Sequence, residues 1–145
     1  MQKVLVLGAG KIGSLISGLL AETGDYEVHV ADVNGELVRA VVAAHGLDNL
    51  FAHGFDARDA AALAAHLRAH PVDAVISSLP FYCNVTVAEA ARASGIHYFD
   101  LTEDVAVTRA VRRLAEGADT AFVPQCGLAP GFISIAANAL IGHFD

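Results

Sequence analysis

Residues 4–13 read VLVLGAGKIG, and this stretch decides the fold class of the chain. Its first four residues are apolar and predict a buried strand, and the glycine-rich turn that follows leads into a helix predicted over residues 11–23. Asp32 closes the next apolar run, nineteen residues after Gly13. This succession of strand, glycine turn, helix, strand and acid is typical of a βαβ unit that binds a dinucleotide.

Each position of the turn has a physical role in such a unit. Gly8 allows the tight turn, Gly10 lets the backbone approach a pyrophosphate, and Gly13 lets helix and sheet pack closely. Lys11 and Ile12 begin the helix, whose unpaired N–H groups and dipole favour the negative charge of phosphates. The alternative is a glycine turn in an unrelated α/β protein.

Asp32 and the neighbouring Val33 are expected to contact the cofactor. A carboxylate at the end of the second strand accepts hydrogen bonds from both ribose hydroxyls and repels a 2′-phosphate. Residues 33–36 contain no Arg or Lys that could pair with such a phosphate. The sequence therefore predicts NAD in preference to NADP. The alternative is that Asp32 serves as a turn or N-cap residue for the helix that begins near Gly35.

Composition restricts the function further. The 145 residues suffice for one domain with a sizeable core, and the hydrophobic content of 54% suits a sheet that is buried on both faces. The net charge of −7 and the lack of a basic run predict no nucleic-acid partner and no acidic membrane surface. The sequence contains no apolar stretch of membrane-spanning length and enters a strand directly, so no membrane anchor or signal peptide is predicted.

Cysteine and histidine do not form a sequence motif for a metal. Cys83 and Cys126 lie far apart, in neither CxxC nor zinc-like spacing, which predicts a reduced, cytoplasmic setting. His66 and His70 stand four apart on a predicted helix, a spacing that could bind a metal. Because no Glu or third ligand lies nearby in sequence, we interpret this pair as an exposed polar stripe and predict no metal site.

Apolar strands alternate with helical patterns along the whole chain, with short connections between them. Strands are predicted over residues 2–7, 26–31, 49–53, 73–77, 96–100 and 120–124. Helices are predicted over residues 11–23, 35–45, 57–69, 82–94, 104–116 and 131–142. This alternation predicts an α/β fold of the Rossmann type in one domain, residues 1–145, with a doubly wound parallel sheet in the order 3-2-1-4-5-6 and α/β/α layers.

The last predicted helix, residues 131–142, is apolar nearly all round but too short to span a bilayer. We therefore expect protein to bury it on more than one side. Such burial would be incomplete within this chain, which predicts that the chain is a fragment and that a second domain follows it.

Ligands of an open parallel sheet bind outside the carboxyl ends of its strands. Asp56 follows the third predicted strand, where it either accepts from an adenine amino group or caps the helix predicted from Ala57. The fourth strand is closed by Ser77, Ser78, Leu79 and Pro80. Small residues there leave room for a cofactor, and free backbone groups could contact ribose and nicotinamide, although an ordinary turn is the alternative.

The fifth and sixth predicted strands lead into two further loops at the same edge. Residues 100–104, DLTED, could face a cationic substrate, but for Glu103 and Asp104 we favour a role in the first turn of the next helix and leave Asp100 open. Residues 125–131, QCGLAPG, form a loop at the mouth of the crevice. No histidine is placed by sequence to activate Cys126, so we interpret it as a small residue in a tight loop.

Three segments together resemble a known family. They are VLVLGAGKIG (4–13), VISSLPFYCNVTVAEAARASGIHYFDLT (75–102) and FVPQCGLAPGFISIAANAL (122–140). The chain resembles the saccharopine dehydrogenase-like reductases over essentially its whole length, and within them the L-lysine 6-dehydrogenase-like members. GLAPG followed by an apolar helix is the most specific element of the resemblance.

The resemblance implies an NAD(P)-dependent oxidoreductase that acts on a C–N bond of an amino acid, with a second domain that binds the substrate and forms a homodimer. It implies a cofactor site made of Gly8, Gly10, Lys11, Ile12, Gly13, Asp32, Ser78, Leu79 and Pro80. It places Asp100, Thr102, Gly127, Pro130 and Gly131 near the nicotinamide crevice. A nucleotide-sensing regulatory module of the kind that gates potassium transport is the alternative, and the SSLP and GLAPG segments count against it.

Overall fold

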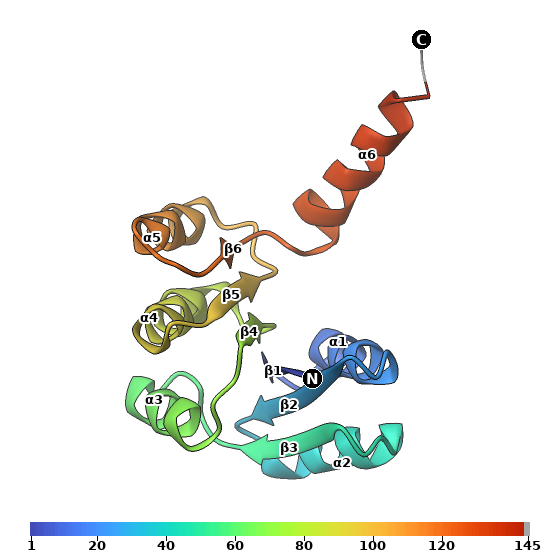
Figure 1. The fold of residues 1–145 in the computed structure, drawn as a ribbon, viewed down its shortest axis with the longest axis vertical. Coiled ribbons are helices and arrows are strands. Elements are labelled where there is room, and N and C mark those ends of the chain that lie inside the picture. Colours follow the sequence, from blue (N-terminus) through green and yellow to red (C-terminus); the bar gives the residue numbers. More distant parts are fainter. Residues whose placement is uncertain (144–145) are drawn as a thin grey trace.

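The computed structural model describes residues 1–143 and contains one six-stranded parallel sheet in the order β3-β2-β1-β4-β5-β6 (Figure 1). The strands are β1 (Gln2–Leu7), β2 (Tyr26–Asp32), β3 (Leu50–Gly54), β4 (Ala74–Ser77), β5 (His97–Asp100) and β6 (Phe122–Val123). Every strand pair is parallel. The predicted fold class and strand order are confirmed.

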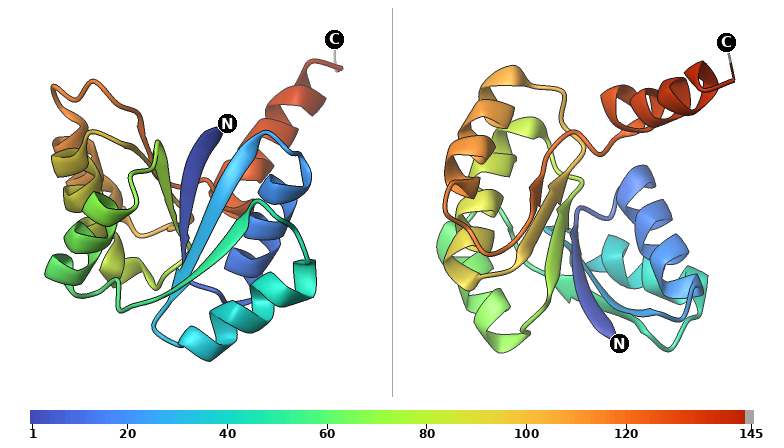
Figure 2. Two further views of the ribbon diagram at one scale, coloured as in Figure 1. Left: turned by 60° about the horizontal axis from the view of Figure 1, so that its bottom comes forward. Right: turned by 45° about the horizontal axis from the view of Figure 1, so that its top comes forward.

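Helices cover both faces of the sheet (Figures 1 and 2). One face carries α1 (Lys11–Glu22) and α2 (Gly35–His45). The opposite face carries α3 (Ala60–Ala69), α4 (Asn84–Ser94) and α5 (Val105–Ala115). The remaining helical segments are the short 3₁₀ turn η1 (Phe81–Cys83), the π turn η2 (Leu128–Phe132) and α6 (Ile133–Ile141).

The central strand β1 shows how the sequence builds these layers. Val4 and Val6 pack into one core cluster together with buried residues of α1 and α2, whereas Leu5 and Leu7 pack into the other cluster with α3, α4 and α5. Successive side chains of a strand point to opposite faces, so a continuous apolar run is buried on both. The strand–helix alternation thus encloses the sheet between two cores.

Several element boundaries differ from the predicted ones for identifiable reasons. α3 begins at Ala60 rather than at residue 57, because the Asp59 carboxylate accepts hydrogen bonds from the N–H groups of Ala61 and Ala62 and caps the helix there. β6 contains only two residues, and the proline at position 124, which has no N–H to donate to a ladder, follows it directly.

α6 projects away from the rest of the molecule (Figure 2). Its apolar side chains are uncovered within the chain, with Ile135 exposed to 70% and Ile141 to 68%. The expected lack of burial within this chain is therefore observed. Among residues 1–143, no helix combines the length and the apolar character that crossing a bilayer requires.

Candidate functional site

The site lies at the carboxyl edge of the sheet, between β1 and β4, where the strand order reverses. Gly8 follows β1 with a φ of +97°, a conformation that side chains strongly disfavour. The turn is packed tightly, because a Cβ on Gly8 would stand 3.0 Å from the carbonyl oxygen of Ser78, and one on Gly13 would overlap the carbonyl oxygen of Gly8. Both glycines are required for α1 to begin so close to the strand ends.

The start of α1 is open to an anionic ligand. Gly10 occupies the N-cap position, no side chain caps the helix, and the first turn contains no acidic residue. The first N–H groups of a helix have no partner within it, so those of Lys11 and Ile12 remain available. A Cβ on Gly10 would have no atom within 4 Å. The protein therefore offers a backbone cradle with room for a pyrophosphate directly against it.

Asp32 ends β2 beside this cradle. Its Oδ2 accepts a hydrogen bond of 2.8 Å from the Ala9 N–H, and its Oδ1 accepts one of 2.9 Å from the Asn34 N–H. The N-cap of α2 is Asn34, whose side chain accepts from the N–H groups of Glu36 and Leu37, so the N-cap alternative for Asp32 is wrong. Asp32 therefore stabilises the turn after β2 and links this turn to the glycine loop. The neighbouring Val33 is 64% exposed.

Arg39 is a cation near this end of β2 that the sequence analysis missed. It lies on α2, and its Nη1 is 3.3 Å from the position that a Cβ on Gly35 would occupy. Residues 33–36 contain no basic residue, but a helix brings the residue one turn later back over its own start. One positive and one negative side chain therefore flank the end of β2.

Asp56 follows β3 and binds Arg58. The Arg58 guanidinium donates to both carboxylate oxygens, with Nε 2.9 Å from Oδ1 and Nη2 2.8 Å from Oδ2. These hydrogen bonds hold the pKa of Asp56 down to about 2. The helix-cap alternative for Asp56 is wrong, because Asp59 caps α3. A contact between Asp56 and adenine stays a prediction.

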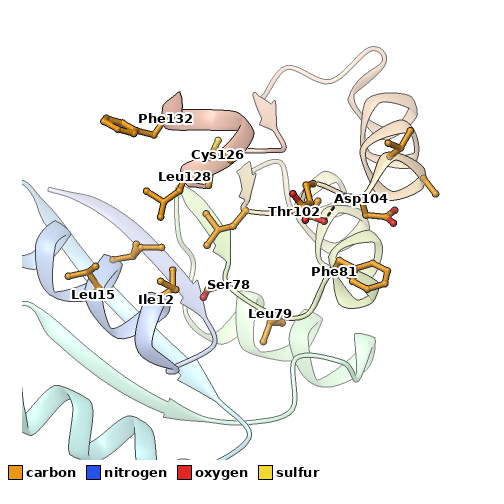
Figure 3. A pocket seen from close by; sticks show the side chains of 17 residues that line it. Ile12, Leu15, Ser78, Leu79, Phe81, Thr102, Asp104, Cys126, Leu128 and Phe132 are labelled. Atoms are coloured by element: carbon orange, nitrogen blue, oxygen red, sulfur yellow. Dashed lines mark hydrogen bonds between the residues drawn. The ribbon is translucent and has the colours of Figure 1, made fainter. Parts of the chain in front are cut away.

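A cleft of about 1300 Å³ extends from the first turns of α1 across the ends of β4 and β5 to η2 (Figure 3). Of the predicted residues, Ile12, Ser78, Leu79, Thr102 and Gly127 line it. Apolar residues that the sequence analysis did not assign to the site also line it, among them Leu15, Ile16, Phe81, Leu101, Leu128 and Phe132. The acidic Glu103 and Asp104 lie in the same lining. In Figure 3, Ile12 and Leu15 of α1 lie opposite Leu128 across the opening. The spacing of Ile12, Leu15 and Ile16 along one face of α1 is the signal that could have found this wall.

Other predicted site residues lie outside the cleft lining. Ser77 is buried, and its hydroxyl donates to the Asn84 Oδ1 over 2.7 Å. Pro80 is exposed at the start of η1, Pro130 is half-buried in η2, and a Cβ on Gly131 would lie 2.6 Å from the Gln125 carbonyl oxygen. Ser77 and Gly131 thus support the cleft indirectly. Ser77 does so through its hydrogen bond to Asn84, and Gly131 through close packing against the backbone of residues 125–126.

Asp100 is fully buried at the end of β5. Its carboxylate accepts hydrogen bonds from the Tyr98 hydroxyl at 2.7 Å, the Thr102 N–H at 3.0 Å and the Gln125 N–H at 3.1 Å. Burial, together with the neighbouring carboxylate, raises the pKa of Tyr98 above its usual range. Asp100 therefore ties together the two loops that form the far wall of the cleft.

Asp104 of this wall has the helix-terminal role expected of it, and Cys126 lies in the same wall. Asp104 is the N-cap of α5 and accepts from the Val107 N–H at 2.8 Å, as favoured from the sequence. Cys126 lines the cleft with its thiol 3.2 Å from the Val123 carbonyl oxygen. Burial and the Asp100 carboxylate raise the thiol's pKa, which keeps it protonated and supports its interpretation as a small loop residue.

The histidines of α3 differ from their expected arrangement. His66 is partly buried and stacks on Phe55 with ring centroids 4.4 Å apart, so the interpretation as an exposed stripe is wrong for it. His53 of β3 supplies a third imidazole within reach of His66 and His70. The sequence did not reveal His53 as a partner, because the contact forms between the sheet and the helix that covers it.

Comparison with solved structures supports the fold. Saccharopine dehydrogenase (L-Glu forming) from Saccharomyces cerevisiae matches 99% of this chain at 24% identity and a TM-score of 0.84, and 31% of that chain is covered. The WlbA dehydrogenase from Chromobacterium violaceum, in complex with NADH and UDP-GlcNAcA, matches 85% of this chain at 20% identity and a TM-score of 0.67, and 34% of that chain is covered. Prephenate dehydrogenase from A. aeolicus, in complex with hydroxyphenyl propionate and NAD⁺, matches 86% at 18% identity and a TM-score of 0.64, and 41% of that chain is covered.

This chain therefore spans between 31% and 41% of the length of these three enzymes. A profile of the family described as "Saccharopine dehydrogenase NADP binding domain" matches residues 4–123, from the first buried residue of β1 to the end of β6. The matched span contains the glycine turn, Asp32 and the ends of all six strands, which bind a nicotinamide dinucleotide in this fold. The chain belongs to the saccharopine dehydrogenase NADP-binding domain family.

Proposed function

We propose that this chain is the NAD-binding domain of a dehydrogenase that oxidises a C–N bond of an amino acid, or reduces the corresponding imine. The cofactor assignment depends mainly on one observation. No side chain caps the N-terminus of α1, and the space beside Gly10 at this N-terminus is open. A bound nicotinamide dinucleotide supplies hydride transfer. The residues of this chain hold its pyrophosphate on the N–H groups of α1 and its nicotinamide in the cleft between Ser78 and Thr102.

NAD is proposed in preference to NADP on the position of Asp32. The two backbone hydrogen bonds fix the carboxylate beside the glycine loop, and each carboxylate oxygen retains a lone pair for a ribose hydroxyl. A 2′-phosphate at the same position would meet this negative charge. Arg39 lies close by, and its positive charge favours a 2′-phosphate and hence NADP. We give Asp32 more weight, because a hydrogen bond fixes its carboxylate at the glycine loop.

Calorimetric titration of the chain with NAD⁺, NADH and NADPH tests this preference. We expect NADH to bind at least tenfold more tightly than NADPH. Asp32→Ala should weaken NADH and bring the two affinities together, and adding Arg39→Ala should then weaken NADPH selectively. Asp25→Ala, which removes an exposed aspartate outside the cleft, is the matched control and should change neither affinity. Equal affinities in the unaltered chain would contradict the assignment of Asp32 to the ribose.

The substrate class is proposed from the family and from the saccharopine dehydrogenase that shares the fold. We propose that a second domain completes the substrate site and that the full protein is a homodimer. Both cysteines are free thiols, which supports the proposal of a reducing, cytoplasmic setting.

Turnover assays distinguish the domain from the full protein. We expect this 145-residue chain to bind NADH without forming NADH from NAD⁺ and lysine or saccharopine. A full-length protein that contains it should reduce NAD⁺ with a basic amino acid or run the reverse reductive amination. Substantial amino-acid-dependent NADH formation by the chain alone would show that its cleft already holds a complete substrate site.

A further inference from the structure

Four histidines gather on the α3 side of the sheet, and none of them lines the cleft. His29 of β2 and His53 of β3 lie on neighbouring strands, while His66 and His70 come from the end of α3. The ring centroids of His53, His66 and His70 lie 4.7–4.8 Å apart. One ring nitrogen from each of these three residues lies within 4.8 Å of the other two.

Glu27 and His29 determine which nitrogen of His53 carries a lone pair. Hydrogen bonds from Lys3 and His29 lower the pKa of Glu27, so its carboxylate only accepts, and the His29 Nε2, 3.0 Å away, carries the proton. In a neutral ring, the His29 Nδ1 is then an acceptor, to which the His53 Nε2–H donates over 2.8 Å. The lone pair of a neutral His53 is thereby left on Nδ1. A carboxylate–histidine chain of this kind orients imidazoles that bind metals.

His66 contributes a nitrogen that needs a partner. Its Nε2 is buried and has no hydrogen-bond partner among the described residues. A buried polar atom without a partner is costly, and coordination to a cation would satisfy it.

We propose that His53, His66 and His70 bind one Zn²⁺ ion, with water in the fourth position and Glu27 and His29 as positioning residues. Imidazole nitrogens are ligands that zinc prefers, and the absence of a carboxylate from the three disfavours Mg²⁺ or Ca²⁺. Tetrahedral zinc, with bonds of about 2.0–2.1 Å, holds its nitrogens roughly 3.4 Å apart. The present separations close by small ring rotations, for which the exposed His70 has room.

Zinc titration of a tag-free, chelator-treated chain against a chromophoric competitor tests the site. We expect one Zn²⁺ per chain with micromolar or tighter affinity, and a cobalt derivative with the visible absorption of tetrahedral Co²⁺. His53→Gln, His66→Gln and His70→Gln should each weaken binding at least 100-fold. Glu27→Gln should weaken it about tenfold, because the carboxylate orients His29, which in turn orients His53. Zinc should also raise the Tm of the unaltered chain but not that of His70→Gln.

His143→Ala is the matched control, because it removes an exposed histidine outside the cluster. It should leave affinity and stoichiometry unchanged. Circular dichroism checks that each variant folds, and His70→Gln, at an exposed helix end, is the variant least able to disturb the core. The proposal is overturned if His70→Gln binds zinc as the unaltered chain does, or if affinity falls equally in His143→Ala.

Discussion

Gly10 is the residue at which the open cradle of the site can be closed without disturbing the fold. Its backbone is extended, with φ −67° and ψ −173°, a conformation that any residue can adopt. No atom lies within 4 Å of the position of its missing Cβ. Gly13, three residues later, differs because its missing Cβ would overlap the Gly8 carbonyl oxygen. A substitution at Gly10 therefore tests ligand binding, whereas a substitution at Gly13 would also disturb the fold.

Gly10→Val should abolish measurable NADH binding while the chain stays folded. The added methyl groups would fill the space that the pyrophosphate needs, whereas the only expected structural cost is the poorer N-cap, at about 1 kcal/mol. Calorimetry with NADH gives the affinity, and thermal unfolding gives the stability. Gly10→Ala, with a single methyl group, is the graded control and should weaken binding less. Unchanged NADH affinity in Gly10→Val would exclude the proposed pyrophosphate position.

Asp100 holds the loop after β5 to the segment after β6. The carboxylate is the shared acceptor for Thr102 and Gln125, which come from the two loops. Gln125 has a φ of +68°, so its backbone adopts a conformation that a non-glycine residue rarely takes without support. The hydrogen bond from the Gln125 N–H to Asp100 supplies such support beside the cleft.

Asp100→Asn should therefore loosen the far wall of the cleft. Hydrogen bonds to a buried charged group contribute about 1.5–3 kcal/mol each, and in this variant an NH₂ group would replace the oxygen that accepts from the Tyr98 hydroxyl. We expect the free energy of unfolding to fall by roughly 2–3 kcal/mol in urea titration. Asp119→Asn, at an exposed aspartate, is the control and should change the stability by less than about 0.5 kcal/mol. A neutral effect of Asp100→Asn would show that the two loops are held by other contacts.

Sequence patterns located most elements because each pattern has a local cause. Runs of apolar residues bounded by turns fixed β1 and β2 to within a residue, and Asn34 marks the start of α2. The burial of Asp100 was accessible from the two-residue period of β5, because Tyr98 and Asp100 lie on the same face of the strand and Tyr98 is fully buried. The approach of Arg39 to Gly35 and the contact of His53 with α3 depend on packing between elements, which no local pattern contains.

Large apolar side chains are exposed along α6, on Phe132 directly before it, and on α1. Phe132, Ile133 and Leu140 are 58–61% exposed, and Ile12, Leu15 and Leu19 of α1 are 50–56% exposed. Fully burying one such side chain contributes about 1.5–3 kcal/mol. An exposed surface of this kind favours association with another protein surface.

The chain should therefore form dimers through α6 at high concentration. Sedimentation velocity across a concentration series measures the association. A variant with Ile135→Glu and Leu140→Glu should remain monomeric, because charge on the helix would have to be desolvated in the interface. The control carries Ala40→Glu and Ala44→Glu on the exposed side of α2, which adds the same charge elsewhere and should associate as the unaltered chain does. A monomeric unaltered chain at the highest concentration would refute this prediction.

The reversal of strand order at β1 also has a consequence for how the chain folds. β1, β2 and β3 come from residues 2–54, β4, β5 and β6 from residues 74–123, and in the sheet only the pairing from Val4↔Ala74 to Leu7↔Ser77 joins the two halves. The cradle and the cleft wall come from different halves, so they meet only when the halves have docked. A dinucleotide therefore binds only the assembled sheet, and at 100 times its Kd it would stabilise the whole domain by about 2.7 kcal/mol. Docking of the two halves is thus the step in folding that a bound cofactor makes harder to reverse.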